Sequence, residues 1–149
     1  MGEIAIGNEA LESVVLTALT QLKNGKIDAA IACFAEEFRF KDLGMGLEFK
    51  DKERLAEFFQ KARQLYPESL LETDTIFVNG DHVIIEWTLQ ATLTEPFYGG
   101  LSRKVRVSVQ GASIVRTDKG KITDWADYYD GLAARRTALA SYFTEWVEP

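Results

Sequence analysis

The residues best suited to chemistry in this chain gather in its last predicted strand, residues 120–130. Because a strand turns successive side chains to opposite faces, Trp125, Asp127 and Tyr129 share one face. A carboxyl group between two aromatic rings loses hydration if that face is buried, and its pKa then rises towards neutrality. Such a group exchanges a proton readily near pH 7. The spacing leaves two interpretations of Asp127, a general acid or base in an apolar pocket and a structural carboxylate at a sheet rim.

A second carboxylate, Asp42, ends a short strand that alternation predicts over residues 38–42, and it precedes a glycine-rich bend at residues 43–46. It is either a second polar group of the same site or the cap of that bend. Asp130 precedes Gly131 and a helical segment, which is typical of an N-cap. Other residues could form the walls of a pocket or belong to the core, namely Trp87, Trp125, Tyr129, Phe40, Phe58, Phe59 and Met45.

Several other chemistries lack the residues that they need. His82 is the only histidine, which excludes a Ser-His-Asp triad elsewhere and a site with several histidine ligands. Its place beside a predicted turn indicates an exposed residue, and Cys33, the only cysteine, is expected to be buried and inert. Phosphate-binding, dinucleotide-binding, zinc-protease and Cys-x-x-Cys motifs are absent from the sequence. We therefore expect neither a cofactor nor a metal.

Helices are predicted in the first half of the chain, where apolar residues recur at helical spacing. The first helix is capped by Asn8 and stopped by Asn24 and Gly25, and a short one follows from Lys26 and carries residues 27–34. A third begins after a cap at Asp51 and ends at Pro67. A terminal helix is predicted over about residues 132–147.

Strands are predicted in the second half, where the apolar period changes to two. They cover residues 70–78, 83–93, 104–117 and 120–130, with turns at 79–81 and 118–120 and a loop at 96–100. Gly111 is a candidate for a bend or bulge. Helices followed by hairpin-connected strands predict an α+β fold, in which a curved antiparallel sheet wraps over the helices as a cone with a pocket inside.

Composition sets the broad class. With 149 residues, 46% of them hydrophobic and 27% charged, the chain suffices for a single domain over residues 1–149, with a core at about 9–130. A net charge of −6 gives no electrostatic basis for binding nucleic acid or an anionic membrane. No secretory signal and no apolar run of about 18 residues is visible. We expect a cytoplasmic protein whose partner is a small molecule.

Segments 86–89, 94–97 and 103–111 form strand, loop and strand motifs of the E-W-T-L, G-P-F and R-V-x-V-x-G types. In this order they resemble the SnoaL-like branch of the nuclear transport factor 2-like, or cystatin-like, cone fold. Segment 120–130 is also similar to the closing strand of limonene-epoxide hydrolases. The resemblance covers residues 9–130 and implies the cone fold and a homodimer through the open sheet face, on which Ile84 and Ile114 lie.

The resemblance implies roles for some residues and denies others. Asp127 matches an aspartate that acts on water and epoxide in the hydrolases, but Trp87 and Leu89 stand where a second aspartate and an arginine are needed. Asp42 matches the base of ketosteroid isomerases, whereas Ala112 falls at their oxyanion-stabilising acid. The remaining pattern resembles polyketide cyclases, in which one pocket aspartate does the acid–base work.

Two classes of function stay open at this stage. The first is a cofactor-independent cyclase, isomerase or hydrolase for an apolar or cyclic metabolite, with Asp127 as acid or base and Asp42 as a second polar group. The second is a non-catalytic ligand-binding or protein-interaction domain of the same fold. An enzyme requires Asp127 inside a closed apolar cavity with a raised pKa, close to another polar group. A binding module requires an apolar pocket in which backbone donors or an arginine already satisfy Asp127, and an interaction domain requires a large exposed apolar patch instead of a cavity.

Overall fold

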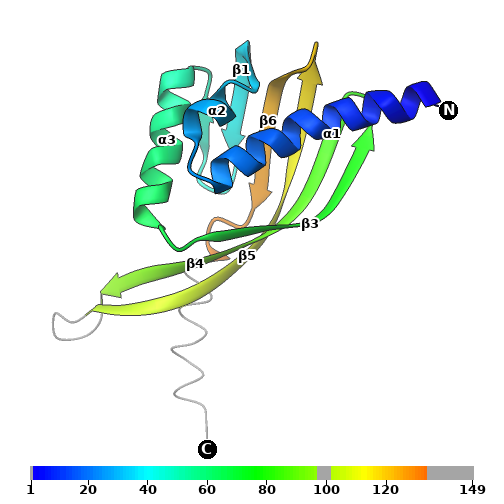
Figure 1. The fold of residues 1–149 in the computed structure, drawn as a ribbon. Coiled ribbons are helices and arrows are strands. Elements are labelled where there is room, and N and C mark those ends of the chain that lie inside the picture. Colours follow the sequence, from blue (N-terminus) through cyan, green and yellow to red (C-terminus); the bar gives the residue numbers. More distant parts are fainter. Residues whose placement is uncertain (1, 97–101, 134–149) are drawn as a thin grey trace, which may run out of the picture.

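A computed structural model describes residues 2–96 and 102–133, which form helices on one side of a curved sheet (Figure 1). The helices are α1 (Gly2–Lys23), α2 (Ile27–Ile31) and α3 (Lys52–Leu65). The strands are β1 (Phe34–Asp42), β2 (Leu47–Phe49), β3 (Leu70–Asn79), β4 (His82–Pro96), β5 (Ser102–Asp118) and β6 (Lys121–Tyr129).

Helix boundaries follow the local signals of the sequence, with two exceptions. The cap of α3 is confirmed, because the Asp51 carboxylate accepts a hydrogen bond from the Arg54 backbone N–H at 3.0 Å. Helix α1 begins at Gly2, ahead of the predicted cap at Asn8. The short helix α2 ends at Ile31, and Phe34 of its predicted apolar face instead begins β1.

The sheet is mixed, so the prediction of a wholly antiparallel sheet is wrong in one place. Its strand order is β2-β1-β6-β5-β4-β3, and β1 pairs with β6 in parallel. Strands β1 and β6, which are far apart in the sequence, are thus neighbours in the sheet. The period of apolar residues does not show which strands pair or in which direction they run. Strand β2 was not predicted either, because three residues are too few for alternation to be visible.

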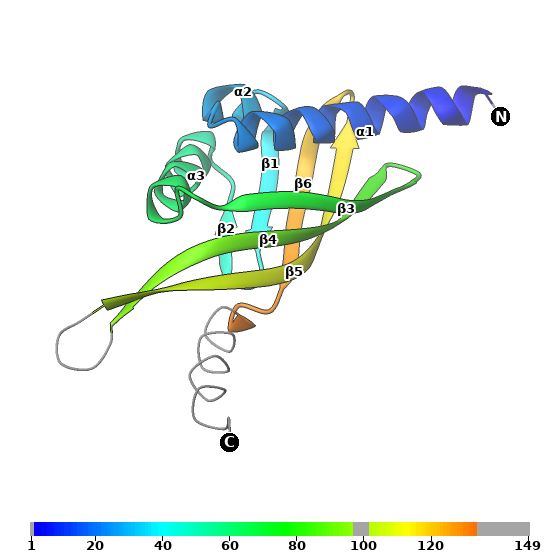
Figure 2. The same cartoon turned by 60° about the horizontal axis from the view of Figure 1, so that its bottom comes forward.

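The core lies between the helices and the concave face of the sheet, as the two views show (Figures 1 and 2). Buried residues of α1 and α3, such as Val15 and Leu55, pack in one cluster with Phe34, Ile85 and Trp125 of the strands. Burial of these apolar surfaces is the main force that holds helices and sheet together. Successive side chains of a strand point to opposite faces, so one set of each strand faces this core and the other faces outward.

Strands β4 and β5 extend as a long ribbon beyond the rest of the sheet (Figure 2). Their pairing runs without a register shift past the partners Trp87 and Gly111, so the bulge considered at Gly111 is not present. A Cβ at Gly111 would overlap the Trp87 ring and would lie 2.9 Å from the Tyr128 carbonyl oxygen. Glycine is required here because the indole packs directly on the backbone.

Two predicted segments fall largely outside the described residues. The terminal helix over 132–147 is described only for its first two residues, and the loop at 96–100 only for Pro96. Within the described residues, none of the helices is both long enough and apolar enough to cross a membrane.

Candidate functional site

Three neighbouring strands bring polar side chains together on the concave face. Their pairing places Asp127 of β6 beside Asp42 of β1 on one side and Ser113 of β5 on the other. Paired strands lie about 4.8 Å apart, so these side chains are immediate neighbours. Trp125, Asp127 and Tyr129 alternate along β6 with the outward Ala126 and Tyr128, as the sequence predicts.

A chain of hydrogen bonds holds the Asp127 carboxyl group. Its Oδ1 accepts one bond from Ser113 Oγ at 2.5 Å and another from Trp125 Nε1 at 2.7 Å. Ser113 Oγ in turn accepts a bond from Trp87 Nε1 at 2.9 Å. Both of these hydrogen bonds are made to Oδ1, and Asp127 Oδ2 receives no hydrogen bond from the described residues.

The surroundings of Asp127 shift its proton affinity. Burial, which disfavours the charged form, raises the pKa of Asp127 from 3.8 to about 6. The bonds from Ser113 and Trp125 favour the carboxylate and hold this pKa lower than burial alone would, while the neighbouring Asp42 raises it. The group is therefore a mixture of acid and carboxylate close to neutral pH.

Asp42 both caps the bend after β1 and contacts a residue of β6. Its Oδ1 accepts a bond from the Met45 backbone N–H at 2.9 Å, which caps the bend after β1. The same oxygen accepts a bond from the Tyr129 hydroxyl at 2.7 Å, which ties Asp42 to β6. Burial, first of all, raises the pKa of the Tyr129 phenol further above its ordinary value, so this hydroxyl remains a donor.

Aromatic residues surround the polar group, although the structure does not bring every predicted residue to it. The Trp87 and Tyr129 rings have centroids 5.9 Å apart, and Phe40 stacks on Trp125 at 6.2 Å. Phe58 and Phe59 of α3 extend this aromatic group, with centroids 6.3 and 5.4 Å from that of Phe40. Met45 is 61% exposed, and its backbone rather than its side chain contacts Asp42.

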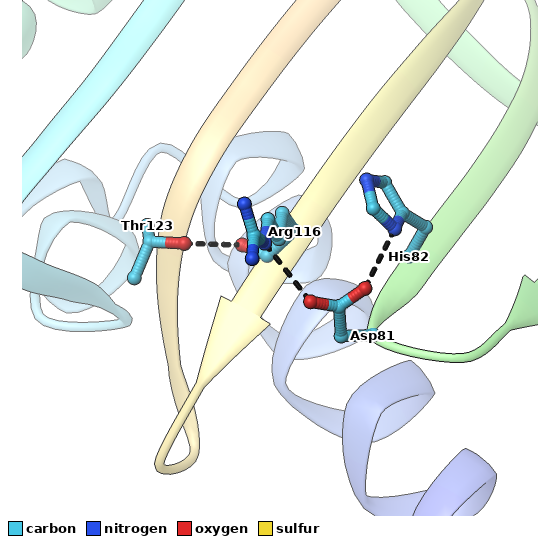
Figure 3. Close-up of polar contacts among 4 residues, drawn as sticks. All are labelled: Asp81, His82, Arg116 and Thr123. Carbon is cyan, nitrogen blue, oxygen red and sulfur yellow. Dashed lines mark hydrogen bonds and ion pairs between the residues drawn. The ribbon is translucent and has the colours of Figure 1, made fainter.

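The single histidine lies away from this group, at the turn between β3 and β4 (Figure 3). The Asp81 carboxylate bridges His82 Nδ1 at 2.7 Å and Arg116 Nε at 2.9 Å. The bond from Arg116 lowers the pKa of Asp81. Thr123 Oγ1 donates to the Arg116 carbonyl oxygen at 3.3 Å, so the cluster links the turn to β5 and β6 (Figure 3).

Cys33 is buried as expected, and burial raises the pKa of its thiol, which makes it a poor nucleophile. Asp130 Oδ1 accepts a bond from the Leu132 backbone N–H at 2.9 Å, within a turn. The helix that Asp130 was expected to cap lies largely outside the described residues. Among the described side chains, no group of three or more could hold a metal ion.

Sequence reasoning missed Ser113. The buried positions Val105, Val107 and Val109 alternate along β5, and the same period continued through Gly111 turns Ser113 inward. Ala112, next to it, pairs with the outward Tyr128 and so belongs to the other face. The signal was present in the alternation, but only the pairing register shows that Ser113 is directly opposite Asp127.

The SnoaL-like domain family matches residues 15–125, most of the chain, and the protein therefore belongs to this family. The match ends at Trp125, so Asp127 and Tyr129 lie just beyond it. No curated protein matches the sequence significantly.

Many solved structures share the fold of this chain, among them three with 12–19% sequence identity. One is a protein of ketosteroid isomerase-like fold from Catenulispora acidiphila in complex with trimethylamine, with 18% identity over 83% of this chain and 90% of the other, and a TM-score of 0.71. An M. tuberculosis epoxide hydrolase similar to limonene-epoxide hydrolase has 19% identity, coverage of 95% and 98%, and a TM-score of 0.71.

A third, provisionally assigned as a SnoaL-like polyketide cyclase from Shewanella denitrificans, has 12% identity, coverage of 87% and 97%, and a TM-score of 0.74. At such identities the likeness establishes the nuclear transport factor 2-like fold of this chain and leaves its chemistry to the site itself.

Proposed function

We propose that this protein is a cofactor-independent acid–base enzyme that acts on a small apolar, carbonyl-bearing or cyclic metabolite. The observation that carries the proposal is Asp127, whose pKa is about 6 and whose Oδ2 receives no hydrogen bond from the described residues. A carboxyl group with this pKa is present in both protonation states near pH 7 and can act as acid and as base in one cycle.

In the proposed mechanism Asp127 Oδ2 exchanges a proton with the substrate. Asp42, held by the Tyr129 hydroxyl, provides a second polar group beside it. Trp87, Trp125 and Tyr129, with the more distant residues Phe40, Phe58, Phe59 and Met45, would contribute apolar contacts. Proton transfer to and from carbon or oxygen needs only such a placed carboxyl group, which is why no cofactor is invoked.

A non-catalytic ligand-binding domain is the second candidate, and one observation favours it. Oδ1 of Asp127 and Oδ1 of Asp42 each accept two hydrogen bonds from within the chain, as structural carboxylates do. The Catenulispora acidiphila neighbour is in complex with trimethylamine, which shows that this fold accommodates a small ligand. In that case Asp127 would orient a bound molecule without transferring a proton.

The activity test is a screen of ketones, cyclic enols and epoxides with the unmodified protein and with Asp127→Asn. We expect the substitution to lower turnover about 10²- to 10⁴-fold, the usual contribution of a general acid or base. Asp81→Asn is the matched control, since Asp81 lies at the distant turn and should leave turnover unchanged. Equal activity of the Asp127→Asn variant and the unmodified protein would contradict the proposal.

We also propose a cytoplasmic homodimer formed through the outward face of the sheet. Apolar residues of β3, β4 and β5 pair in a row there, with Phe77 52% exposed and Ile84 and Ile114 beside it, and Tyr128 is 47% exposed nearby. An exposed apolar group of this kind is typical of an interface. Ile114→Glu should convert a dimer to a monomer in sedimentation velocity, and a monomeric unmodified protein would contradict the proposal.

A further inference from the structure

The part of the site that the family resemblance does not assign is the hydrogen-bond chain from Trp87 through Ser113 to Asp127. Ser113 is 2% exposed, so its hydroxyl has no solvent to exchange partners with. That hydroxyl donates its one proton to Asp127 Oδ1 and accepts the Trp87 indole N–H. The bond to Asp127 is short at 2.5 Å and the bond from Trp87 has the usual length of 2.9 Å, and together they fix the direction of the hydroxyl.

The start of this chain is itself held in place by packing. The Trp87 indole lies against the backbone at Gly111, where a Cβ would overlap the ring, and its centroid is 5.9 Å from that of Tyr129. The indole N–H therefore has a defined direction, and Ser113 is the acceptor that it meets. A rigid donor at one end makes the hydroxyl between Trp87 and Asp127 a directed donor rather than a rotor.

The carboxyl end of the chain is fixed by two donors on one oxygen. Ser113 Oγ of β5 donates to Asp127 Oδ1, and so does Trp125 Nε1, which lies on β6 with Asp127. Two donors from different strands on a single oxygen restrict rotation of the carboxyl plane. The other oxygen, Oδ2, receives no hydrogen bond from the described residues.

We propose that Ser113 is a positioning residue of this site, whose hydroxyl, directed by Trp87, holds Asp127 Oδ1 so that Oδ2 is the oxygen that exchanges the proton. This inference rests on the proposed acid–base function and specifies how the acid is held. It assigns a role to a residue that makes no contact with the substrate in the mechanism. A serine at this place would also tune the acid, because its bond stabilises the carboxylate more than the neutral form.

The experiment is an NMR titration of the Asp127 side-chain carboxyl carbon, with Asp127→Asn to assign its signal. It is done on the unmodified protein, on Ser113→Ala and on Ser108→Ala. Ser108 is the matched control because it is an exposed serine on the opposite face of the same strand. Removal of the Ser113 bond should raise the titration midpoint by about one pH unit, the usual worth of one hydrogen bond to a charged group. The Ser108→Ala variant should keep the midpoint of the unmodified protein.

Ser113→Thr and Trp87→Phe test the same chain from two other sides. The threonine retains a hydroxyl and should keep the midpoint close to that of the unmodified protein. The phenylalanine removes the indole N–H together with part of the buried ring, and it should raise the midpoint less than Ser113→Ala does. Trp87→Phe also provides an answer if Ser113→Ala does not fold. An unchanged midpoint in the folded Ser113→Ala protein, or in Trp87→Phe where that is the variant that folds, overturns the positioning role.

The two proposals fail in distinguishable ways. A midpoint near 3.8 in the unmodified protein would remove the basis of the acid–base function whatever Ser113 does. A midpoint near 6 that does not respond to Ser113→Ala would leave that function standing and reject only the role of Ser113.

Discussion

Asp127 and Asp81 are the same residue type in opposite surroundings. Asp127 lies on the concave face among Trp87, Trp125 and Tyr129, and burial raises its pKa to about 6. Asp81 lies at the exposed turn between β3 and β4, where Arg116 binds it and lowers its pKa. The difference arises because desolvation acts against charge, whereas a cation next to a carboxylate favours it. Local sequence singles out Asp127 through its alternation with Trp125 and Tyr129, but it does not show how far either aspartate is desolvated.

The largest effect of this difference should be on the pH dependence of stability. Below about pH 4 Asp127 is protonated in both folded and unfolded states, and above about pH 6 it is ionised in both. Because the folded pKa is the higher one, its contribution to the free energy of unfolding falls by about 3 kcal/mol as pH rises through this window. Asp127→Asn should remove this loss.

The measurement is urea unfolding of the unmodified protein and the Asp127→Asn variant between pH 4 and about 7.5. The difference between the two curves isolates Asp127 from the other carboxyl groups. Asp81→Asn should run parallel to the unmodified protein over this range, since a lowered pKa makes Asp81 stabilising above its unfolded value and this stability is lost only as pH falls below that value. Parallel curves for Asp127→Asn and the unmodified protein would show that Asp127 is not desolvated.

The next largest effect should be on stability, through the packing of the Trp87 ring against the backbone at Gly111. Gly111→Ala should cost about 2 kcal/mol of unfolding free energy, because its Cβ would overlap the Trp87 ring and crowd the Tyr128 carbonyl. Denaturant unfolding followed by tryptophan fluorescence would report both the loss and the displaced indole. Ala112→Gly, one residue away on the outward face, should cost about 0.5–1 kcal/mol and leave the fluorescence unchanged.

A smaller effect is expected at the second carboxyl group of the concave face. Tyr129→Phe removes the hydroxyl that Asp42 accepts at 2.7 Å, while the Met45 backbone bond remains. The loss should be about 1 kcal/mol of unfolding free energy. Tyr128→Phe is the control, since Tyr128 is 47% exposed on the other face and should change stability by much less. Equal losses for the two variants would mean that the Tyr129–Asp42 bond contributes nothing.

The smallest effect should be at the exposed turn itself. Asp81→Asn breaks the contacts with His82 and Arg116, which are open to water and screened by salt. We expect the melting temperature at pH 7 to fall by no more than about 2 °C, and less still in 1 M salt. A larger fall that persists in high salt would show that the turn cluster is more than a solvated ion pair.

Several features of the fold and site could be predicted because their causes are local. The shared face of Trp125, Asp127 and Tyr129 follows from the period of a strand, and the cap at Asp51 follows from the residues next to it. Ser113 and β2 were not predicted. Strand β2 has three residues, too few for alternation to be visible. Ser113 matters because it is directly opposite Asp127, and the pairing register of two strands leaves no periodic signal in the sequence.

The sequence by itself determined the order of the elements, their inward and outward faces and the membership of Asp127 in an aromatic surrounding, since these depend on spacing and residue type. The tertiary structure decided that β1 lies parallel to β6, which brings Asp42 next to Asp127. The register of the antiparallel pair β5 and β6 brings Ser113 to the other side of Asp127. The tertiary structure also decided the raised pKa of Asp127. This pKa depends on how deeply the carboxyl group is buried and how close Asp42 lies to it, and both are set by the packing of strands that are distant in the sequence.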